Sequence, residues 1–281
     1  MPEVLRYAAF IDPSEADGGN PAGVVLDADG LDDAEMQRIA ADVGYAETAF
    51  LVGQDGAARR IRYYSPIAEV PFCGHATIAT AVVLAEREGA GLFRFATPVG
   101  DVPIETIATD AGIRATFTSV DPVVSDLAPD VREALLALLG LSESDLDGAY
   151  GPRIARAGNP HPVLVIADRA RFDGFSFDPV AVRSLMDEQG WTGTVTVMHR
   201  DPAGDWEARN LFPVGAITED PATGSAAASF GGYLRALRAV PVGETTHVRI
   251  RQGRHVGRPC LLEVEIPPTG GIRVSGSAAA L

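Results

Sequence analysis

Three ionisable side chains are placed where they could transfer protons: Glu47, His75 and Asp220. Glu47 interrupts a run of small and apolar residues, His75 stands at the start of a predicted helix, and Asp220 precedes the start of another. A carboxylate removed from water has a raised pKa, so near neutral pH it can both accept and return a proton. These residues are the candidates for acid/base chemistry.

Each candidate also has a purely structural interpretation. Glu47 would be an ordinary surface residue if its strand lay at the edge of a sheet with this side chain in solvent. A single histidine near a helix start, such as His75, is more often structural than catalytic. Asp220, which is followed by Pro221, could cap its own helix. The local sequence leaves these alternatives open.

The two cysteines, Cys73 and Cys260, suggest a different chemistry. In a two-thiol racemase, one thiolate removes a proton and a thiol on the other face of the substrate returns it. Cys73 suits one of these roles because a helix start lowers the pKa of a nearby thiol. Cys260 begins an apolar strand and is predicted to be core, so the partner thiol is missing.

The sequence predicts neither a metal nor a cofactor. His161 lies in a turn cluster, and the remaining histidines lack metal-ligand spacing: His199, His247 and His255. The chain has no lysine, so all 23 basic residues are arginine. Schiff-base chemistry, including pyridoxal phosphate held on a lysine, and the nucleotide-binding P-loop are therefore excluded.

The formal net charge of -15 opposes binding to nucleic acid or to an anionic membrane surface. No stretch approaches about 18 uninterrupted apolar residues, and the first residues lack a basic region followed by an apolar core. We expect a cytoplasmic protein that binds a small molecule.

The elements that position the candidates follow a mixed α/β order that occurs twice. We expect helices at residues 32–43, 75–86, 131–139, 179–188 and 225–237, with strands between them. Residues 118–130, rich in Asp, Pro and Ser, are predicted to be a linker. The predicted domains are residues 1–118 and 119–281, and the last few residues are allowed to return to the first domain.

Two of these helices begin with runs rich in Ala, Gly, Ser and Thr, and each follows a glycine turn. Such small side chains allow close approach on every face, so both helices are predicted to be central to their domains and surrounded by strands. The free N–H groups at the two helix starts could together hold the carboxylate of a ligand in a cleft between the halves.

Four motifs in one order make the chain resemble the phenazine biosynthesis PhzF-like family, relatives of diaminopimelate epimerase. The motifs are Gly19-Asn20-Pro21-Ala22-Gly23, Glu47-Thr48-Ala49-Phe50, Cys73-Gly74-His75-Ala76-Thr77 and Glu219-Asp220-Pro221-Ala222-Thr223-Gly224-Ser225-Ala226. The resemblance spans nearly the whole chain. It implies an α+β fold with two pseudo-symmetric domains, each a mostly antiparallel sheet rolled around a central helix, and a homodimer.

The same resemblance implies an active site between the domains and assigns roles there. Glu47 would be the general acid/base, and His75 and Asp220 would hold and help protonate the substrate. Asn20, Gly74, Gly224 and Ser225 would bind the substrate, with backbone amides on its carboxylate. The implied activity is a cofactor-independent isomerisation of a small carboxylate, as in phenazine biosynthesis; the alternatives are a two-base epimerase or racemase and a non-catalytic carboxylate-binding relative.

Overall fold

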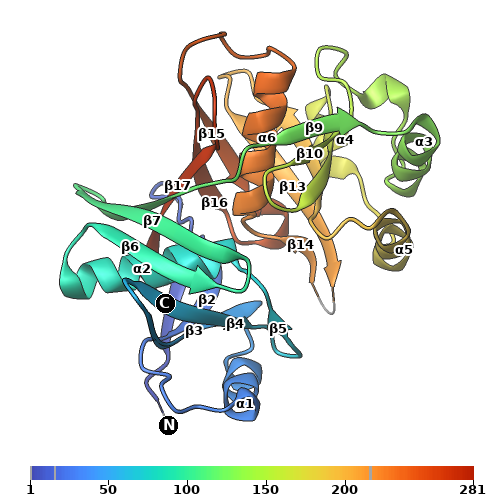
Figure 1. Cartoon of the computed structure of the whole chain (residues 1–281). Coiled ribbons are helices and arrows are strands. Elements are labelled where there is room, and N and C mark those ends of the chain that lie inside the picture. Colours follow the sequence, from blue (N-terminus) through green and yellow to red (C-terminus); the bar gives the residue numbers. More distant parts are fainter. Residues whose placement is uncertain (1, 16, 215–216) are drawn as a thin grey trace. The chain divides into compact units, whose positions relative to one another are not determined.

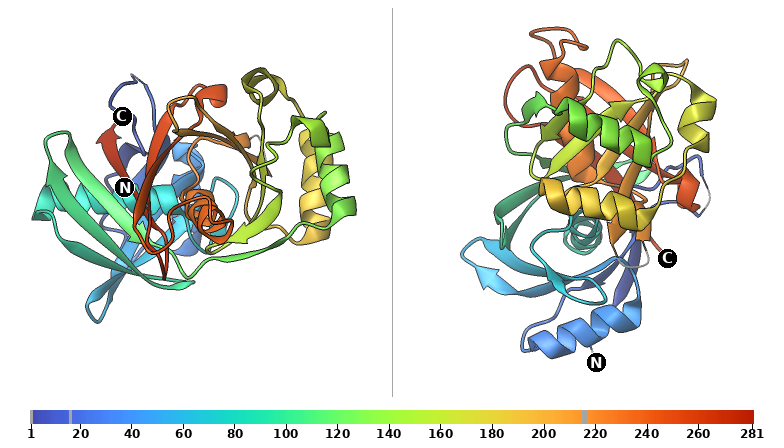
Figure 2. Two further views of the ribbon diagram at one scale, coloured as in Figure 1. Left: turned by 90° about the horizontal axis from the view of Figure 1, so that it is seen from above. Right: turned by 90° about the vertical axis from the view of Figure 1, so that its right-hand side faces the viewer.

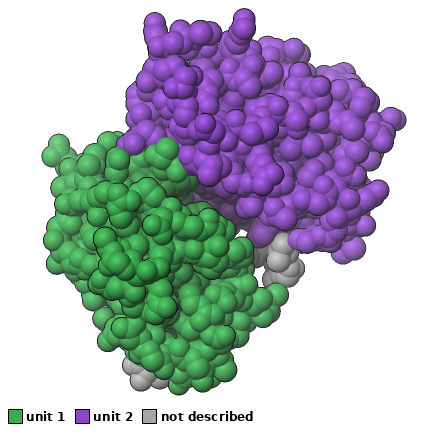
Figure 3. Space-filling model, viewed as in Figure 1, with its two compact units in different colours: residues 1–118, 275–281 green, residues 119–274 purple. Residues whose placement is uncertain are grey.

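The computed structural model describes residues 2–15, 17–214 and 217–281. The chain divides into two compact units, one made of residues 1–118 with 275–281 and the other of residues 119–274 (Figure 3). Each unit is described on its own.

The first unit is a ring of strands around one helix (Figure 1). Its strands are β1 (Leu5–Ala9), β2 (Asn20–Val25), β3 (Glu47–Asp55), β4 (Ala58–Tyr64), β5 (Glu69–Val70), β6 (Leu92–Thr97), β7 (Gly100–Thr109), β8 (Gly112–Thr118) and the end of β17 (Arg273–Ala280). Its helices are α1 (Asp33–Val43) and α2 (Gly74–Glu88). Pairing runs from β1 through β2, β3, β4, β6, β7 and β8 to β17 and back to β1, which closes the sheet.

Helix α2 fills this ring. Its residues from His75 to Ala85 are all buried, and it contacts β1, β2, β3, β7 and β8. Small side chains on all faces make this fit possible because each surrounding strand can approach the helix backbone closely. Helix α1 lies outside the ring, where it contacts β3 and β4 and begins at a capping box formed by Asp32 and Glu35.

The second unit repeats this plan and adds outer helices. Its strands are β9 (Val123–Asp126), β10 (Arg153–Arg156), β11 (Pro160–Val165), β12 (Val195–Arg200), β13 (Trp206–Val214), β14 (Ile217–Asp220), β15 (Thr246–Gln252), β16 (Cys260–Ile266) and the start of β17. Its helices are α3 (Pro129–Leu138), α4 (Arg169–Gly174), α5 (Pro179–Gln189) and α6 (Gly224–Ala236), with short 3-10 turns at Glu143–Asp145 and Arg254–Val256. Helix α6 is almost wholly buried and contacts β9, β10, β11 and β16. Figure 2 shows α6 nearly end-on in its left view and α2 nearly end-on in its right view.

The strand pairings of the two units correspond one to one. In the first unit β2 and β3 are parallel, β3 and β4 antiparallel, and β4 and β6 parallel across the segment that contains α2. In the second unit β11 and β12, β12 and β13, and β13 and β15 repeat these three relations, with α6 in the place of α2. The predicted fold class, with two pseudo-symmetric units and mostly antiparallel sheets around central helices, is confirmed.

One predicted element is wrong, and one alternative left open for Glu47 is ruled out. The predicted linker contains strand β9, which pairs antiparallel with β10, because partners far along the chain supply the hydrogen bonds that its Asp- and Ser-rich composition does not suggest. Strand β3 is not at an edge, since it pairs with β2 on one side and with β4 on the other. Within the described ranges, none of the helices combines the length and apolar character needed to cross a membrane.

Candidate active site

Glu47 is the first residue of β3 and lies in the interior of the sheet of the first unit. Its partner across the parallel pair is Ala22 of β2. Alternate residues of a strand share a face, so Asn20, two residues before Ala22, lies on the same face as Glu47. Asn20 is buried, and the side chain of Glu47 is 18% exposed. The interpretation of Glu47 as a solvated edge residue is therefore wrong.

Glu47, Cys73 and His75 form one compact cluster at the start of α2. The Cys73 thiol lies 3.5 Å from Glu47 Oε2 and 3.3 Å from His75 Nδ1. His75 Nε2 is 3.4 Å from Glu47 Oε2. Cys73 and His75 are both buried, so the carboxylate of Glu47 is the most accessible part of the cluster.

A chain of hydrogen bonds anchors this helix start. Thr77 Oγ1 donates to the carbonyl of Cys73 at 2.6 Å, and the hydroxyls of Thr77 and Tyr63 are 2.6 Å apart. Tyr63 is fully buried on β4 and packs edge-to-face against Phe72. The backbone that carries Cys73 and His75 is thus held against β4, the strand next to β3. This contact keeps both side chains close to Glu47.

Burial lowers the pKa of His75 to about 4, and a hydrogen bond to the backbone of Pro21 partly opposes the shift. The imidazole is therefore neutral at neutral pH. The neutral ring has one N–H, which it donates to the Pro21 carbonyl, so its other nitrogen can accept a hydrogen bond from a ligand without adding positive charge to the cluster.

The same three side chains could hold a metal ion. One ligand atom from each of Glu47, Cys73 and His75 lies within 4.8 Å of the others. The sequence predicted no metal because its histidines lack the usual short spacing. Glu47 is 26 residues from Cys73, so only the pairing of β3 in the folded sheet brings these donors together.

In the second unit, Asp220 ends β14 and helps to shape the turn before α6. Its Oδ2 accepts a hydrogen bond from the Thr223 hydroxyl at 2.6 Å, and Gln252 Nε2 donates to the Asp220 carbonyl and to Thr223 Oγ1. The helix cap is Thr223, and its side chain makes no capping hydrogen bond to the helix. The alternative in which Asp220 is the cap residue of α6 does not hold, because the cap residue is Thr223 and Asp220 lies at the end of β14.

Gly253 supports this turn from the neighbouring 3-10 segment. Its φ is 84°, in the left-handed region. A side chain at this position would come within 2.6 Å of the Pro221 carbonyl and closer still to that of Arg258. Only glycine satisfies both conditions.

Ser225 contacts a buried polar network centred on His161. Its Oγ is 3.1 Å from His161 Nε2, and His161 Nδ1 accepts a hydrogen bond from the backbone N–H of Thr194 at 3.0 Å. Thr194 Oγ1 donates to Asn210 Oδ1 at 2.6 Å. His161 was assigned to a turn cluster, although Gly158-Asn159-Pro160 repeats Gly19-Asn20-Pro21 and marks the equivalent strand start. That repeat could have identified it.

This network holds the ring of His161 in place. Its Nδ1 lies 3.0 Å from the backbone nitrogen, 3.0 Å from the hydroxyl and 3.2 Å from the carbonyl of Thr194, and its Nε2 faces Ser225 Oγ. Burial lowers the pKa of His161 to about 4, so the ring is neutral at neutral pH. The Ser225 hydroxyl is therefore held at the start of α6 by an uncharged partner.

The remaining candidates are a pair of helix starts and one core cysteine. Gly74 and Gly224 are the first residues of α2 and α6, and the side chains of the cap residues Cys73 and Thr223 make no capping hydrogen bond. Cys260 is buried at the start of β16 and donates to the carbonyl of Arg258 at 3.2 Å, as expected of a core residue.

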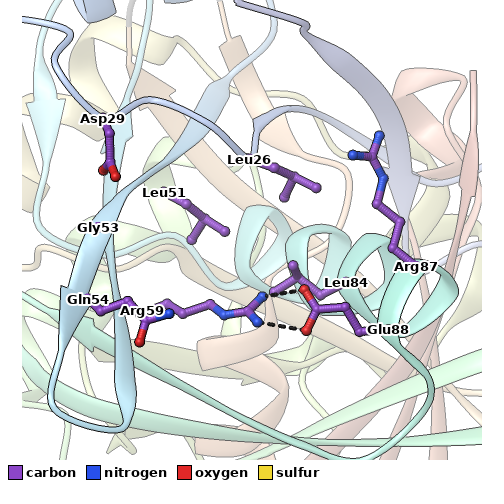
Figure 4. Close-up of a pocket in the computed structure, with 9 residues that line it drawn as sticks. All are labelled: Leu26, Asp29, Leu51, Gly53, Gln54, Arg59, Leu84, Arg87 and Glu88. Carbon is purple, nitrogen blue, oxygen red and sulfur yellow. Dashed lines mark hydrogen bonds and ion pairs between the residues drawn. The ribbon is translucent and has the colours of Figure 1, made fainter.

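A cavity of about 330 Å³ in the first unit lies outside the predicted site (Figure 4). It is lined by Leu26, Asp29, Leu51, Gly53, Gln54, Arg59, Leu84, Arg87 and Glu88. Arg59 and Glu88 form a two-point ion pair across it, with N–O distances of 2.9 and 2.6 Å. Since this pair neutralises both charges, we assign the cavity no part in proton transfer.

The chain belongs to the PhzC-PhzF family, described as phenazine biosynthesis-like proteins, whose model matches residues 7–281. It is 31% identical to the uncharacterised isomerase YddE of Escherichia coli O157:H7, over 100% of this chain and 96% of the relative. It is 32% identical to trans-2,3-dihydro-3-hydroxyanthranilate isomerase of Pseudomonas aeruginosa, over 95% of this chain and 93% of that enzyme.

The fold agrees with this membership. The crystal structure of a PhzF-family phenazine biosynthesis protein from Bacillus anthracis matches with a TM-score of 0.87 and 26% identity, over 99% of this chain and 96% of that one. Relatives named as isomerases support an isomerase or epimerase role for this protein.

Proposed function

We propose that this protein is a cofactor-independent isomerase that moves a proton between two carbons of a small carboxylate substrate, with Glu47 as the general acid/base. The observation that carries the proposal is the position of Glu47. Its Oε2 lies 3.4 to 3.5 Å from the two buried groups His75 and Cys73, while part of its side chain stays accessible. A small ligand can therefore reach this carboxylate.

One carboxylate is sufficient for the proposed reaction. Glu47 removes a proton from one carbon, the electron pair shifts along an adjacent double bond, and protonated Glu47, whose partly exposed carboxyl group exchanges its hydrogen with solvent, returns a proton to the far carbon. No electrons enter or leave the substrate, so the step needs no oxidant or reductant. Neutral His75, whose N–H is donated to the Pro21 carbonyl, offers its other ring nitrogen as an acceptor that holds a substrate hydroxyl or amine beside Glu47.

The second unit is proposed to supply substrate contacts. The amides of Gly224 and Ser225 at the start of α6, with the Ser225 hydroxyl, suit a carboxylate, and those of Gly74 and His75 at the start of α2 do the same. Asp220 is proposed to hold a substrate amine or hydroxyl and to help protonate it, and Asn20 to bind the substrate beside Glu47. The assembly is proposed to be a homodimer, which analytical ultracentrifugation would test.

The deciding experiment follows solvent deuterium into a panel of unsaturated and amino-acid carboxylates by NMR. Trans-2,3-dihydro-3-hydroxyanthranilate is the first compound to test, because the Pseudomonas relative is named for its isomerisation. Wild-type protein should introduce deuterium at a carbon next to a double bond, and Glu47→Gln should lower that rate by about 10³-fold. Glu88→Gln removes a carboxylate of the same unit that is paired with Arg59, and it should leave the rate unchanged.

Two other outcomes would replace the proposal. Activity that survives Glu47→Gln and is lost in Cys73→Ser would assign proton transfer to the thiol, as in an epimerase. Ligand binding in titrations with no deuterium incorporation in any bound compound would make the protein a carboxylate-binding relative without catalysis.

A further inference from the structure

We infer that Glu47, Cys73 and His75 form a binding site for a thiophilic divalent metal ion, of which Zn²⁺ is the best match, and that the bound ion inhibits the enzyme. The binding part rests on geometry alone. The inhibition part rests on the proposed role of Glu47, and the experiment separates the two.

The distances among the three donors match a zinc site without movement of the backbone. A tetrahedral zinc ion, with bonds of about 2.1 Å to nitrogen and oxygen and about 2.3 Å to sulfur, separates its ligand atoms by about 3.4 to 3.6 Å. In this protein, Nε2 of His75 is 3.4 Å from Oε2 of Glu47, and Sγ of Cys73 is 3.5 Å from the same oxygen. The third edge, from Sγ to Nε2, is 3.8 Å.

The chemical types of the three donor atoms indicate which metal ion the site prefers. One thiol sulfur, one imidazole nitrogen and one carboxylate oxygen are a mixed soft and borderline set, which favours Zn²⁺ over the oxygen-seeking Mg²⁺ and Ca²⁺. The His75 ring also hydrogen-bonds the backbone of Pro21, the kind of outer contact that orients metal-binding histidines. Binding would convert the Cys73 thiol to a thiolate and release its proton to solvent.

Two of the three donors are buried, and the site is open to solvent on the side of Glu47. Cys73 and His75 are 7% and 5% exposed, so they are shielded from bulky reagents, while the side chain of Glu47 is 18% exposed. A small ion can enter past the carboxylate, and three protein ligands leave a fourth position for water, as in open zinc sites. A carboxylate bound to zinc cannot take a proton from carbon, so metal binding and catalysis exclude one another.

The first test measures binding with Zn²⁺ and with Co²⁺ as a spectroscopic probe, using the full chain under reducing conditions. We expect one Zn²⁺ per chain by calorimetry, and for Co²⁺ an absorption band from charge transfer between thiolate and metal. Cys73→Ser should abolish that band and weaken Zn²⁺ binding at least about tenfold. Removing a residue that only hydrogen-bonds to a zinc ligand already weakens binding by about tenfold, so removing a ligand should cost no less. Cys260→Ser, which alters the other buried cysteine, should change neither result.

Glu47→Gln and His75→Asn each remove one of the other two donors and should also weaken Zn²⁺ binding. Circular dichroism establishes whether these variants fold. Zn²⁺ binding that is unchanged in Cys73→Ser, or that is lost equally in Cys260→Ser, overturns the site. Stoichiometric binding through Cys73 with undiminished deuterium exchange overturns only the inhibition. If no substrate is found, the binding measurements still show whether the metal site exists. Failure of the proposed isomerase function can therefore be told apart from failure of the metal site.

Discussion

The starts of α2 and α6 occupy equivalent places in the two units but carry different chemistry. At the start of α2, Cys73 and His75 contact Glu47. At the start of α6, Ser225 contacts His161, which is held by Thr194. The strand partner of Glu47 is Ala22, and the residue equivalent to Ala22 after Gly-Asn-Pro in the second unit is His161.

The exchange of residue types suits the two tasks proposed for the helix starts. The cluster of the first unit contains a carboxylate and a thiol, both able to gain or lose a proton. The cluster of the second unit contains hydroxyls and a neutral, buried histidine, so it offers hydrogen bonds without a change of charge. A duplicated fold can therefore present one helix start for proton transfer and the other for binding. Asp220 complicates this division because it places a carboxylate four residues ahead of Gly224.

After Glu47→Gln, replacing the histidine of the α2 cluster should have the largest effect on turnover. We expect His75→Asn to lower the rate of deuterium exchange by about 10² to 10³-fold, because the substrate loses an acceptor that positions it beside Glu47 during proton transfer. The apparent KM should change little. A variant whose KM rises while kcat is kept would place His75 in binding and remove the contrast between the two helix starts.

Gly253 should be the position most important for the shape of the α6 start. Gly253→Ala forces a side chain into the left-handed region and against the Pro221 carbonyl, and we expect it to lower the free energy of unfolding by about 3 kcal/mol. Gly243 is the matched control, since its φ of 85° is similar and nothing lies near its missing side chain. Urea unfolding that finds equal losses in Gly253→Ala and Gly243→Ala would contradict the packing argument.

The neutral state of His161 predicts a pH dependence of stability. Burial lowers its pKa from 6.5 to about 4, so the unfolded chain takes up this proton first as the pH falls. The stabilisation is complete above about pH 6.5 and is lost between that pH and about pH 4. In wild-type protein, His161 should account for a fall of about 2 kcal/mol in unfolding free energy between about pH 7.5 and about pH 5.

His161→Gln removes the titrating group. Between the two pH values, the unfolding free energy of this variant should therefore fall by about 2 kcal/mol less than that of wild-type protein. Urea unfolding at both pH values measures this difference. An unchanged pH dependence in His161→Gln would mean that the His161 ring is charged or solvated in the native state, and the description of the α6 start as an uncharged hydrogen-bonding cluster would be wrong.

Ser225 should give the smallest effect, and one confined to binding. Ser225→Ala removes a single hydroxyl that His161 orients, and we expect affinity for a carboxylate substrate or analogue to weaken about tenfold, with the rate of the bound complex kept. Calorimetry gives the affinity, and exchange at saturating substrate gives the rate. A loss of rate at saturation would assign Ser225 to proton transfer and place chemistry at both helix starts.

Local patterns in the sequence predicted most of the regular elements. Alternating and periodic apolar residues located both central helices and most of the strands to within a few residues, because such patterns depend on neighbours in the chain. Strand β9 was missed, since its pairing with β10 and not its composition makes it a strand. Local sequence also could not decide whether Glu47 is solvated or whether Asp220 caps its helix. Both questions depend on which strands become neighbours in the folded sheet.

The sequence by itself determined the family motifs, the absence of lysine, the small-residue helices and the order of elements, all of which are local or compositional properties. Only the tertiary structure decided which side chains meet. Glu47 reaches Cys73 across 26 residues, and His161 reaches Ser225 across 64. Such contacts come from strand register and burial around the central helices, which are properties of the closed sheet and are not written in any single segment of the chain.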